Sequence, residues 1–236
     1  MQYEGNKIRH ELKYYINPLV YHTLRKRLQY VMTSDPNMPD ENGYLISSLY
    51  FDDLYHSAVN EKNAGVSFRK KYRIRCYGRN DDQIHLECKM KYQEYIAKEQ
   101  AKLSRSEYDH LLKGNFDQMA ERSERVCQQL LGYNRSRLLR PTVVVEYLRE
   151  AYIAKEGNVR ITFDKEIASS VSCLDIFAAG FTTKQILESD TMVMEVKYDE
   201  FLPSYIASLI QTGMTDYCAI SKYVLCREEK GRLLYR

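Results

Sequence analysis

The chain has 236 residues, of which 35 are Lys or Arg and 32 are Asp or Glu, so its formal net charge at pH 7 is only +3. This length can bury a sizeable core, and we expect one domain over residues 1–236. The near balance of charge argues against a general nucleic-acid coat and favours a local anion site.

Alternation of charged and apolar residues predicts most of the strands, because successive side chains leave opposite faces of a pleated backbone. Asn17 and Pro18 suit the N-cap and first position of a helix. In chain order we predict a strand over 7–16, a helix over 18–31, a strand over 44–52, a short helix near 56–63, strands over 68–77, 83–91 and 95–103, two helices within 107–131, a strand from 141 to about 153, strands over 159–167 and 192–198, a helix over 203–211 and a last helix including 221–226. The tract 132–140 is basic and is expected to be a loop.

The predicted strand over 68–77 is the most informative element. Its alternate residues are basic, and the positions between them are mostly apolar. The basic residues at these alternate positions of the segment and its turn are Arg69, Lys71, Arg73, Arg75 and Arg79. Other predicted strands repeat the pattern, so one shared sheet would carry a polar face dense in Lys and Arg with a few Glu. A flat sheet of this kind would repel itself, whereas a barrel would place the charges inside and the apolar residues outside, under helices.

Targeting and redox signals are absent from the sequence. The first 13 residues are charged throughout and lack the apolar core of a signal peptide. No stretch approaches the roughly 20 apolar residues of a membrane span, so we expect a soluble, cytoplasmic protein. The six cysteines form no C-x-x-C pair and have no histidine at metal-ligand spacing, so we expect buried free thiols.

Side-chain recognition of phosphate is the chemistry that the charged face permits. The sequence has no G-x-x-x-x-G-K-[ST] loop, and none of its five histidines has metal-ligand spacing or a G-x-S-x-G neighbour. Lys and Arg would bind successive phosphates. Glu11, Glu87 and Glu195 would hold a divalent metal that bridges phosphate oxygens. The alternative is that these carboxylates only form salt bridges with neighbouring cations.

Short motifs in a fixed order carry a resemblance to a known family. They are ELKY at 11–14, SLYFD at 48–52, RIRCYG at 73–78, ECK at 87–89, PTVVVEYLR at 141–149, VRITFD at 159–164, EVK at 195–197 and SKY at 221–223. As an ordered set they resemble the catalytic VTC (vacuolar transporter chaperone) domain of polyphosphate polymerases, of the stand-alone bacterial type, within the triphosphate tunnel metalloenzyme or CYTH-like superfamily. The resemblance implies an α+β fold: an antiparallel eight-stranded β-barrel, the triphosphate tunnel, with helices packed outside.

The resemblance also implies an activity: a phosphotransferase that moves the ATP γ-phosphate onto a growing polyphosphate chain inside a basic tunnel. The residues that would be catalytic are Lys13, Arg73, Arg75, Lys89, Arg149, Arg160 and Lys222. The implied phosphate-binding set contains these and also Lys98 and Lys197. Glu195, with Glu87 and Glu11, would hold Mn²⁺ or Mg²⁺. ATP and polyphosphate are the expected partners, without nucleic acid; export of product would need a separate membrane partner, which would bring this protein to the membrane.

Two positions depart from the pattern. Arg149 shares a strand face with Val145 and Tyr147 rather than with Glu146, so either a bulge shifts the strand or Glu146 points out of the tunnel. Gln100 stands where the resemblance implies another cation after Lys98.

Two other functions remain open at this point. An inorganic triphosphatase, or another triphosphate hydrolase of the same superfamily, needs the same cations but uses water as the acceptor. A sensor that binds polyphosphate or nucleotide without catalysis is the second alternative. The presence of Glu195 and Lys222 argues against the sensor.

Overall fold

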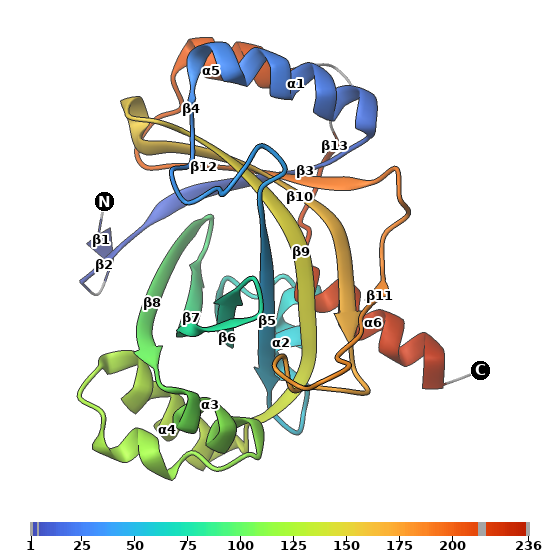
Figure 1. Cartoon of the computed structure of the whole chain (residues 1–236). Helices are drawn as coiled ribbons and strands as arrows, with labels where there is room; N and C mark the ends of the chain where they lie inside the picture. Colours follow the sequence, from blue (N-terminus) through green and yellow to red (C-terminus); the bar gives the residue numbers. More distant parts are fainter. Residues whose placement is uncertain (1, 4, 212–215, 235–236) are drawn as a thin grey trace.

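Eight antiparallel strands form the centre of the computed structural model, which describes residues 2–3, 5–211 and 216–234. The strands are β3 (Arg9–Ile16), β5 (Tyr44–Asp52), β6 (Phe68–Tyr77), β7 (Asn80–Tyr92), β8 (Tyr95–Leu103), β9 (Arg140–Ala154), β10 (Val159–Ser170) and β12 (Met192–Tyr198). Their order is β10-β12-β3-β8-β7-β6-β5-β9, and pairing of β9 with β10 closes the barrel (Figure 1). The α+β barrel expected from the sequence is therefore confirmed.

Short strands and helices complete the fold. The short strands are β1 (Gln2–Tyr3), β2 (Asn6–Lys7), β4 (Thr33–Ser34), β11 (Lys184–Gln185) and β13 (Asp216–Tyr217). The helices are α1 (Pro18–Val31), α2 (Ser57–Asn63), α3 (Arg105–Leu112), η1 (Asp117–Glu121), α4 (Arg125–Arg137), η2 (Glu156–Asn158), α5 (Ser204–Ile210) and α6 (Lys222–Leu234). Within the described residues, no helix is both long enough and apolar enough to cross a membrane.

The loop expected over 132–140 is wrong, because residues 132–137 continue helix α4. An apolar stripe that includes Val126 and Leu130 anchors this helix to the barrel. Arg135 and Arg137 occupy its last turn, where positive charge is favourable beside the unpaired carbonyl groups. The basic composition that suggested a loop belongs to a helix C-terminus.

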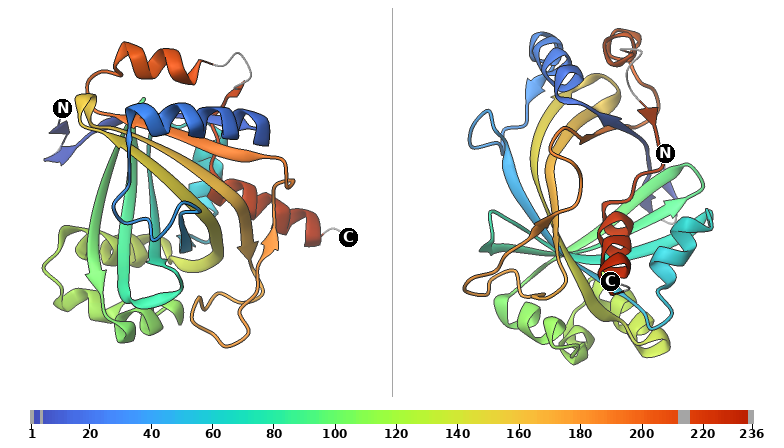
Figure 2. Two further views of the ribbon diagram at one scale, coloured as in Figure 1. Left: turned by 45° about the horizontal axis from the view of Figure 1, so that its top comes forward. Right: turned by 90° about the vertical axis from the view of Figure 1, so that its right-hand side faces the viewer.

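The outward faces of the strands are apolar and covered by helices, as the alternation predicts. One core lies between the outer faces of β5 to β8 and helices α3 and α4, and it contains the fully buried Cys76 and Cys88. A second core lies under α1 and α5, against β10 and β12. Figure 2 shows these two helix pairs on opposite sides of the barrel. No disulfide links the six cysteines, all of which lie in the described part of the chain. Cys76, Cys88, Cys127 and Cys226 are buried as expected, whereas Cys173 and Cys218 are only partly buried, contrary to the expectation.

The interior of the barrel is apolar at one end. There Val143 and Val145 of β9 pack with Ile167 of β10 and with Tyr223 and Val224 of α6. We call this the α6 end of the barrel: β5, β7 and β10 finish there, and β6, β9 and β12 begin there. The opposite opening, where β10 begins, is called the Arg160 end. Helix α6 thus fills the β9 and β10 side of one end of the barrel.

The barrel wall is weakest between β3 and β8, which share only the pairs Arg9 with Ile96 and His10 with Tyr95. Further along β3, the short strand β13 pairs with the same edge. The chain then runs past Lys13, whose Nζ donates to the carbonyl oxygen of Ile220 at 3.0 Å. The segment before α6 therefore completes this part of the wall.

Candidate functional site

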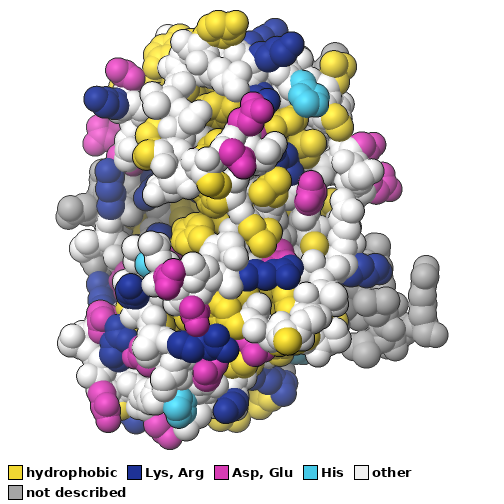
Figure 3. Space-filling model, viewed as in Figure 1, with side chains coloured by type: hydrophobic (Ala, Val, Ile, Leu, Met, Phe, Trp, Pro, Cys, Tyr) yellow, Lys and Arg dark blue, Asp and Glu magenta, His cyan; other side chains and the backbone are white. Residues whose placement is uncertain are grey.

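The barrel encloses a cavity of about 440 Å³ whose lining is strongly basic. Fourteen Lys and Arg line it, against three Glu. On the outer face seen in Figure 3, by contrast, Lys and Arg are interspersed with Asp and Glu. The modest net charge therefore conceals a strongly positive interior, which is suited to binding a polyanion.

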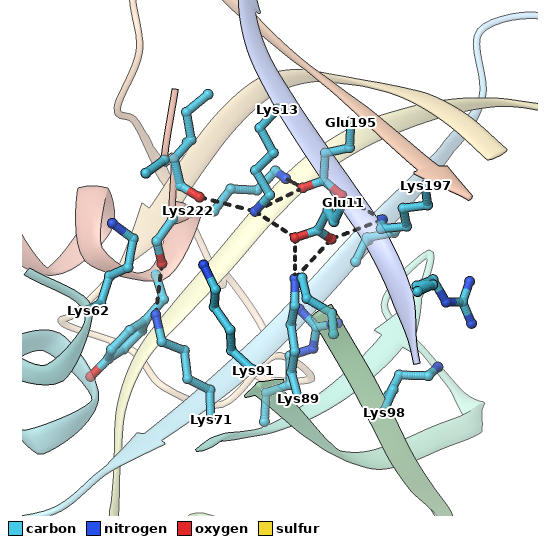
Figure 4. A pocket seen from close by; sticks show the side chains of 18 of the residues that line it. Glu11, Lys13, Lys62, Lys71, Lys89, Lys91, Lys98, Glu195, Lys197 and Lys222 are labelled. Carbon is cyan, nitrogen blue, oxygen red and sulfur yellow. Dashed lines mark hydrogen bonds and ion pairs between the residues drawn. The ribbon is translucent and has the colours of Figure 1, made fainter. Parts of the chain in front are cut away.

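Glu11 and Glu195 lie on adjacent strands in the middle of the cavity (Figure 4), because β3 and β12 pair Lys13 with Glu195 and Glu11 with Lys197. Glu195 accepts from Nζ of Lys222 and of Lys197, both at 2.6 Å. Glu11 accepts from Nζ of Lys89 at 2.8 Å. Burial alone would raise the pKa of Glu195, but Lys197 and Lys222 hold that pKa well below its usual range. Lys13 and Lys89 likewise hold the pKa of Glu11 well below its usual range against the effect of burial, so both carboxylates are ionised.

Glu87 does not line the cavity. Its carboxylate lies behind Arg73, which donates from Nε at 2.8 Å, and behind Lys98, whose Nζ lies at 3.0 Å. Arg75 is 3.8 Å away. The salt-bridge alternative therefore describes the contacts of Glu87, which orients the cations that face the cavity. Gln100 accepts a hydrogen bond from Lys98 at 2.7 Å and continues this group.

Arg149 points into the cavity and Glu146 points out of the barrel, so the departure in strand parity has a simple explanation. The pairing of β9 with β5 is regular from Val143 to Arg149. Glu146 instead binds Arg79 at 2.6 Å, outside the cavity. Arg149 donates to both oxygens of Asp164, at 2.6 and 2.7 Å. The second of the two possibilities left open by the sequence is therefore correct.

Asp164 is a site residue that the sequence reasoning did not select. It is fully buried and also forms an ion pair with Lys222, so one carboxylate positions two of the predicted phosphate-binding residues. The signal was its place on the charged face of β10, two positions beyond Thr162. Asp35 has a similar role at the Arg160 end, where it contacts Arg160 at 2.5 Å. The sequence reasoning also did not select the tyrosines that line the cavity, which are Tyr44, Tyr50, Tyr77, Tyr147, Tyr217 and Tyr223.

The structure brings nearly all the predicted site residues together. The members that line the cavity are Lys13, Arg73, Arg75, Lys89, Lys98, Arg149, Arg160, Lys197, Lys222, Glu11 and Glu195. Lys62 of α2 and Lys91 of β7 line it too, and neither was predicted. Helix α6 begins at the cavity wall with Lys222, so its N-terminal dipole adds to the positive potential there.

The arrangement of Glu11 and Glu195 fits a divalent metal that arrives with phosphate. Among the described residues there is no group of three or more His, Cys, Asp or Glu that could hold a metal ion alone. Mg²⁺ and similar hard cations are commonly bound by one or two carboxylates together with substrate phosphate oxygens. These two carboxylates supply the protein part of such a ligand set.

We expect Lys89 to make the affinity of the cavity for phosphate chains dependent on pH. Burial lowers its pKa to about 7, although Glu11 opposes the shift. A bound phosphate would raise this pKa, so affinity for tripolyphosphate should be highest below pH 7. The affinity should fall by up to about tenfold per pH unit between the pKa of Lys89 in the free protein and its higher pKa in the complex. The Lys89→Arg variant, titrated by calorimetry, should show a flatter profile between pH 7 and 9; an unchanged profile would contradict this assignment.

Strand parity predicts different effects for neighbours on β6. Arg73→Ala and Arg75→Ala should each weaken tripolyphosphate binding roughly tenfold or more, because each removes a charged donor from the cavity. Cys76→Ala should leave affinity unchanged and lower stability by roughly 1–2 kcal/mol, because Cys76 is buried on the outer face. Calorimetric titration and thermal unfolding measure both quantities. Equal loss of affinity in a folded Cys76→Ala protein would refute the parity argument.

The sequence matches the family model described as the VTC domain over residues 8–229. No curated protein matches the chain in sequence. Among solved structures, the PH1819 protein of Pyrococcus horikoshii OT3 is similar, with a TM-score of 0.47, 13% identity, and coverage of 94% of this chain and 99% of that chain. The triphosphatase of the Mimivirus capping enzyme gives a TM-score of 0.43 and 13% identity, over 88% of this chain and 91% of that chain. Family membership rests on the sequence match alone.

Proposed function

The chain belongs to the VTC domain family, and we propose that it is a metal-dependent polyphosphate polymerase, which transfers the γ-phosphate of ATP to a growing polyphosphate chain. The observation that supports this most is the charge of the cavity, with fourteen Lys and Arg against three Glu. A triphosphate carries roughly four negative charges near pH 7. The cavity therefore has cations for considerably more phosphate than one nucleotide supplies.

The cavity also has the shape that a linear product requires. Its lining includes exposed residues at both ends: Tyr77 and Lys98 toward the Arg160 end, and Glu94 and Tyr217 toward the α6 end. A phosphate chain that lies along the barrel would need such contact with solvent at both ends. A site for a single small triphosphate needs only one opening.

In the proposed reaction, a terminal oxygen of the chain attacks the γ-phosphorus of ATP. The bond between that phosphorus and the β–γ bridging oxygen breaks, and ADP leaves with this oxygen. Mn²⁺ or Mg²⁺ held by Glu11 and Glu195 would neutralise charge on the phosphate oxygens. No proton needs to move, because the acceptor is already an anion.

The cations would act by position and charge. Arg149 and Lys222 are held by Asp164, and Arg73 by Glu87, so these side chains are oriented before substrate arrives. Preorganised donors stabilise charge on the transferring phosphate without reorganising during the reaction. The same clamp keeps the chain end and the nucleotide in line.

Incubation of the purified protein with ATP and Mn²⁺ tests the proposal, with ADP measured and the phosphate products sized by electrophoresis. We expect ADP release matched by long-chain phosphate. Orthophosphate equal to ADP, with no chain, would show a triphosphatase of the same superfamily. No ADP with any divalent metal would show a binding protein without catalysis.

A further inference from the structure

The lining cations of the cavity fall into two groups with different partners. Toward the middle and the Arg160 end, most cations form ion pairs with buried carboxylates: Lys13, Lys89 and Lys197 with Glu11, and Arg149 and Lys222 with Asp164 and Glu195. At the α6 end, four cations form no ion pair with a carboxylate among the described residues. These four, which we call the unpaired cations, are Lys62, Arg69, Lys71 and Lys91.

The unpaired cations lie close together because of strand register. Strands β6 and β7 pair Arg69 with Lys91 and Lys71 with Lys89, so their side chains share the inner face at the α6 end. Lys62 reaches the same space from α2, and Figure 4 shows Lys62, Lys71 and Lys91 on one side of the carboxylate pair.

Mutual repulsion accompanies this arrangement. Burial lowers the pKa of Lys71 well below its usual value, and the nearby Lys13 and Lys89 lower it further. Burial and Arg69 likewise lower the pKa of Lys91. Among the described residues, Lys71 Nζ contacts neutral groups: the hydroxyl of Ser221 at 3.0 Å and the ring of Tyr223, whose centroid is 5.4 Å away. Half-buried like charges without counterions are costly, so this part of the cavity is built to receive an anion.

The unpaired cations lie on the side of the α6 end that helix α6 does not fill. The apolar side chains of α6 and of β9 and β10 fill the opposite side, as described above. A ligand that enters or leaves through the α6 end therefore has to pass the unpaired cations. The Arg160 end is different, since Arg160 is already paired with Asp35 and the rings of Tyr44 and Tyr77 lie 5.8 Å apart.

We propose that the unpaired cations form a separate subsite for the phosphate chain, so that the growing polyphosphate extends out through the α6 end while the nucleotide and metal occupy the carboxylate-paired region. A chain suits this subsite because each successive phosphate carries charge, and none of the four cations is paired with a carboxylate among the described residues. Glu94, which also lines this end, is exposed to solvent. This inference rests on the proposed function for the direction of growth, but the binding of a chain at this subsite does not require turnover.

The Arg69→Gln/Lys91→Gln double variant tests the subsite in two binding experiments. Long-chain polyphosphate without metal is the probe for the chain, and a non-hydrolysable β,γ-imido analogue of ATP with Mn²⁺ is the probe for the nucleotide. We expect chain affinity to fall about tenfold or more, and nucleotide affinity to stay within about twofold. The slope of log affinity against log salt for the chain should also decrease by about two, one for each removed contact.

Lys70→Gln is the matched control, because Lys70 is exposed on the outer face of the same strand. An equal loss for both probes in the double variant, or no loss for the chain, would overturn the subsite. A loss in Lys70→Gln as large as in the double variant would overturn it as well. If the wild-type protein makes no chain from ATP but the binding results are as expected, the proposed function fails and the subsite stands.

Discussion

Replacement of Glu195 by glutamine is expected to lower polyphosphate synthesis by roughly two to three orders of magnitude while nucleotide binding persists. Glu195 offers the cavity one of its two central carboxylates, and a neutral amide is a poor ligand for Mn²⁺ or Mg²⁺. The cations that hold phosphate all remain in Glu195→Gln. Rates should be measured across a titration of Mn²⁺, alongside binding of ATP.

The control for Glu195→Gln is Glu121→Gln, which changes an exposed carboxylate at the end of η1. It should have wild-type activity at every Mn²⁺ concentration. Thermal unfolding of both variants separates a catalytic loss from a loss of fold. Wild-type rates in Glu195→Gln at limiting Mn²⁺ would contradict the metal assignment.

Replacement of Asp164 by asparagine is expected to be the most destabilising single change in the cavity, at roughly 3–5 kcal/mol. Asp164 forms ion pairs with Arg149 and Lys222, so its loss leaves two buried cations short of a counterion. For a chain of this length the melting temperature should fall by roughly 10 °C or more. Added tripolyphosphate should restore more stability to Asp164→Asn than to the wild type, because the anion replaces the missing charge.

The matched control is Asp109→Asn, which removes an ion pair with Arg105 on the surface of α3 and should lower the free energy of unfolding by less than about 1 kcal/mol.

The difference in stability between Asp164→Asn and the wild type should also depend on pH. Arg149 and Lys222 hold the pKa of Asp164 below its usual value against the effect of burial. The stabilisation is therefore complete above about pH 4, the value in the unfolded chain, and disappears at lower pH. Equal melting temperatures for Asp164→Asn and Asp109→Asn would contradict the role of Asp164 as the counterion of Arg149 and Lys222.

Much of the barrel follows from local sequence because its strands have two distinct faces. The alternation in β6 predicts which side chains point inward, and Arg73 and Arg75 line the cavity while Cys76 lies in the outer core. The capping residues Asn17 and Pro18 start α1 as predicted, since cap geometry is also local. These features depend on neighbours in the chain.

The missed features depend on contacts between distant segments. Asp164 meets Arg149 because β9 and β10 pair in a particular register, and no local pattern fixes which Arg lies opposite a given Asp. Lys62 reaches the cavity because α2 packs against β6 and α6, which are distant from it in the sequence or separated from it by a turn. Glu87 was selected as a metal ligand by strand parity, which gives the correct face but does not reveal that three cations cover the carboxylate.

The measurement that tests the account most directly is the fate of the γ-phosphate of labelled ATP, followed over time with Mn²⁺ at low salt. A cavity with cations beyond one triphosphate should retain the chain between additions, so most of the label should appear in long-chain phosphate. Higher salt should shorten the chains, because several charge contacts are screened together. Label that appears as orthophosphate in step with ADP, at every salt concentration, would contradict the account.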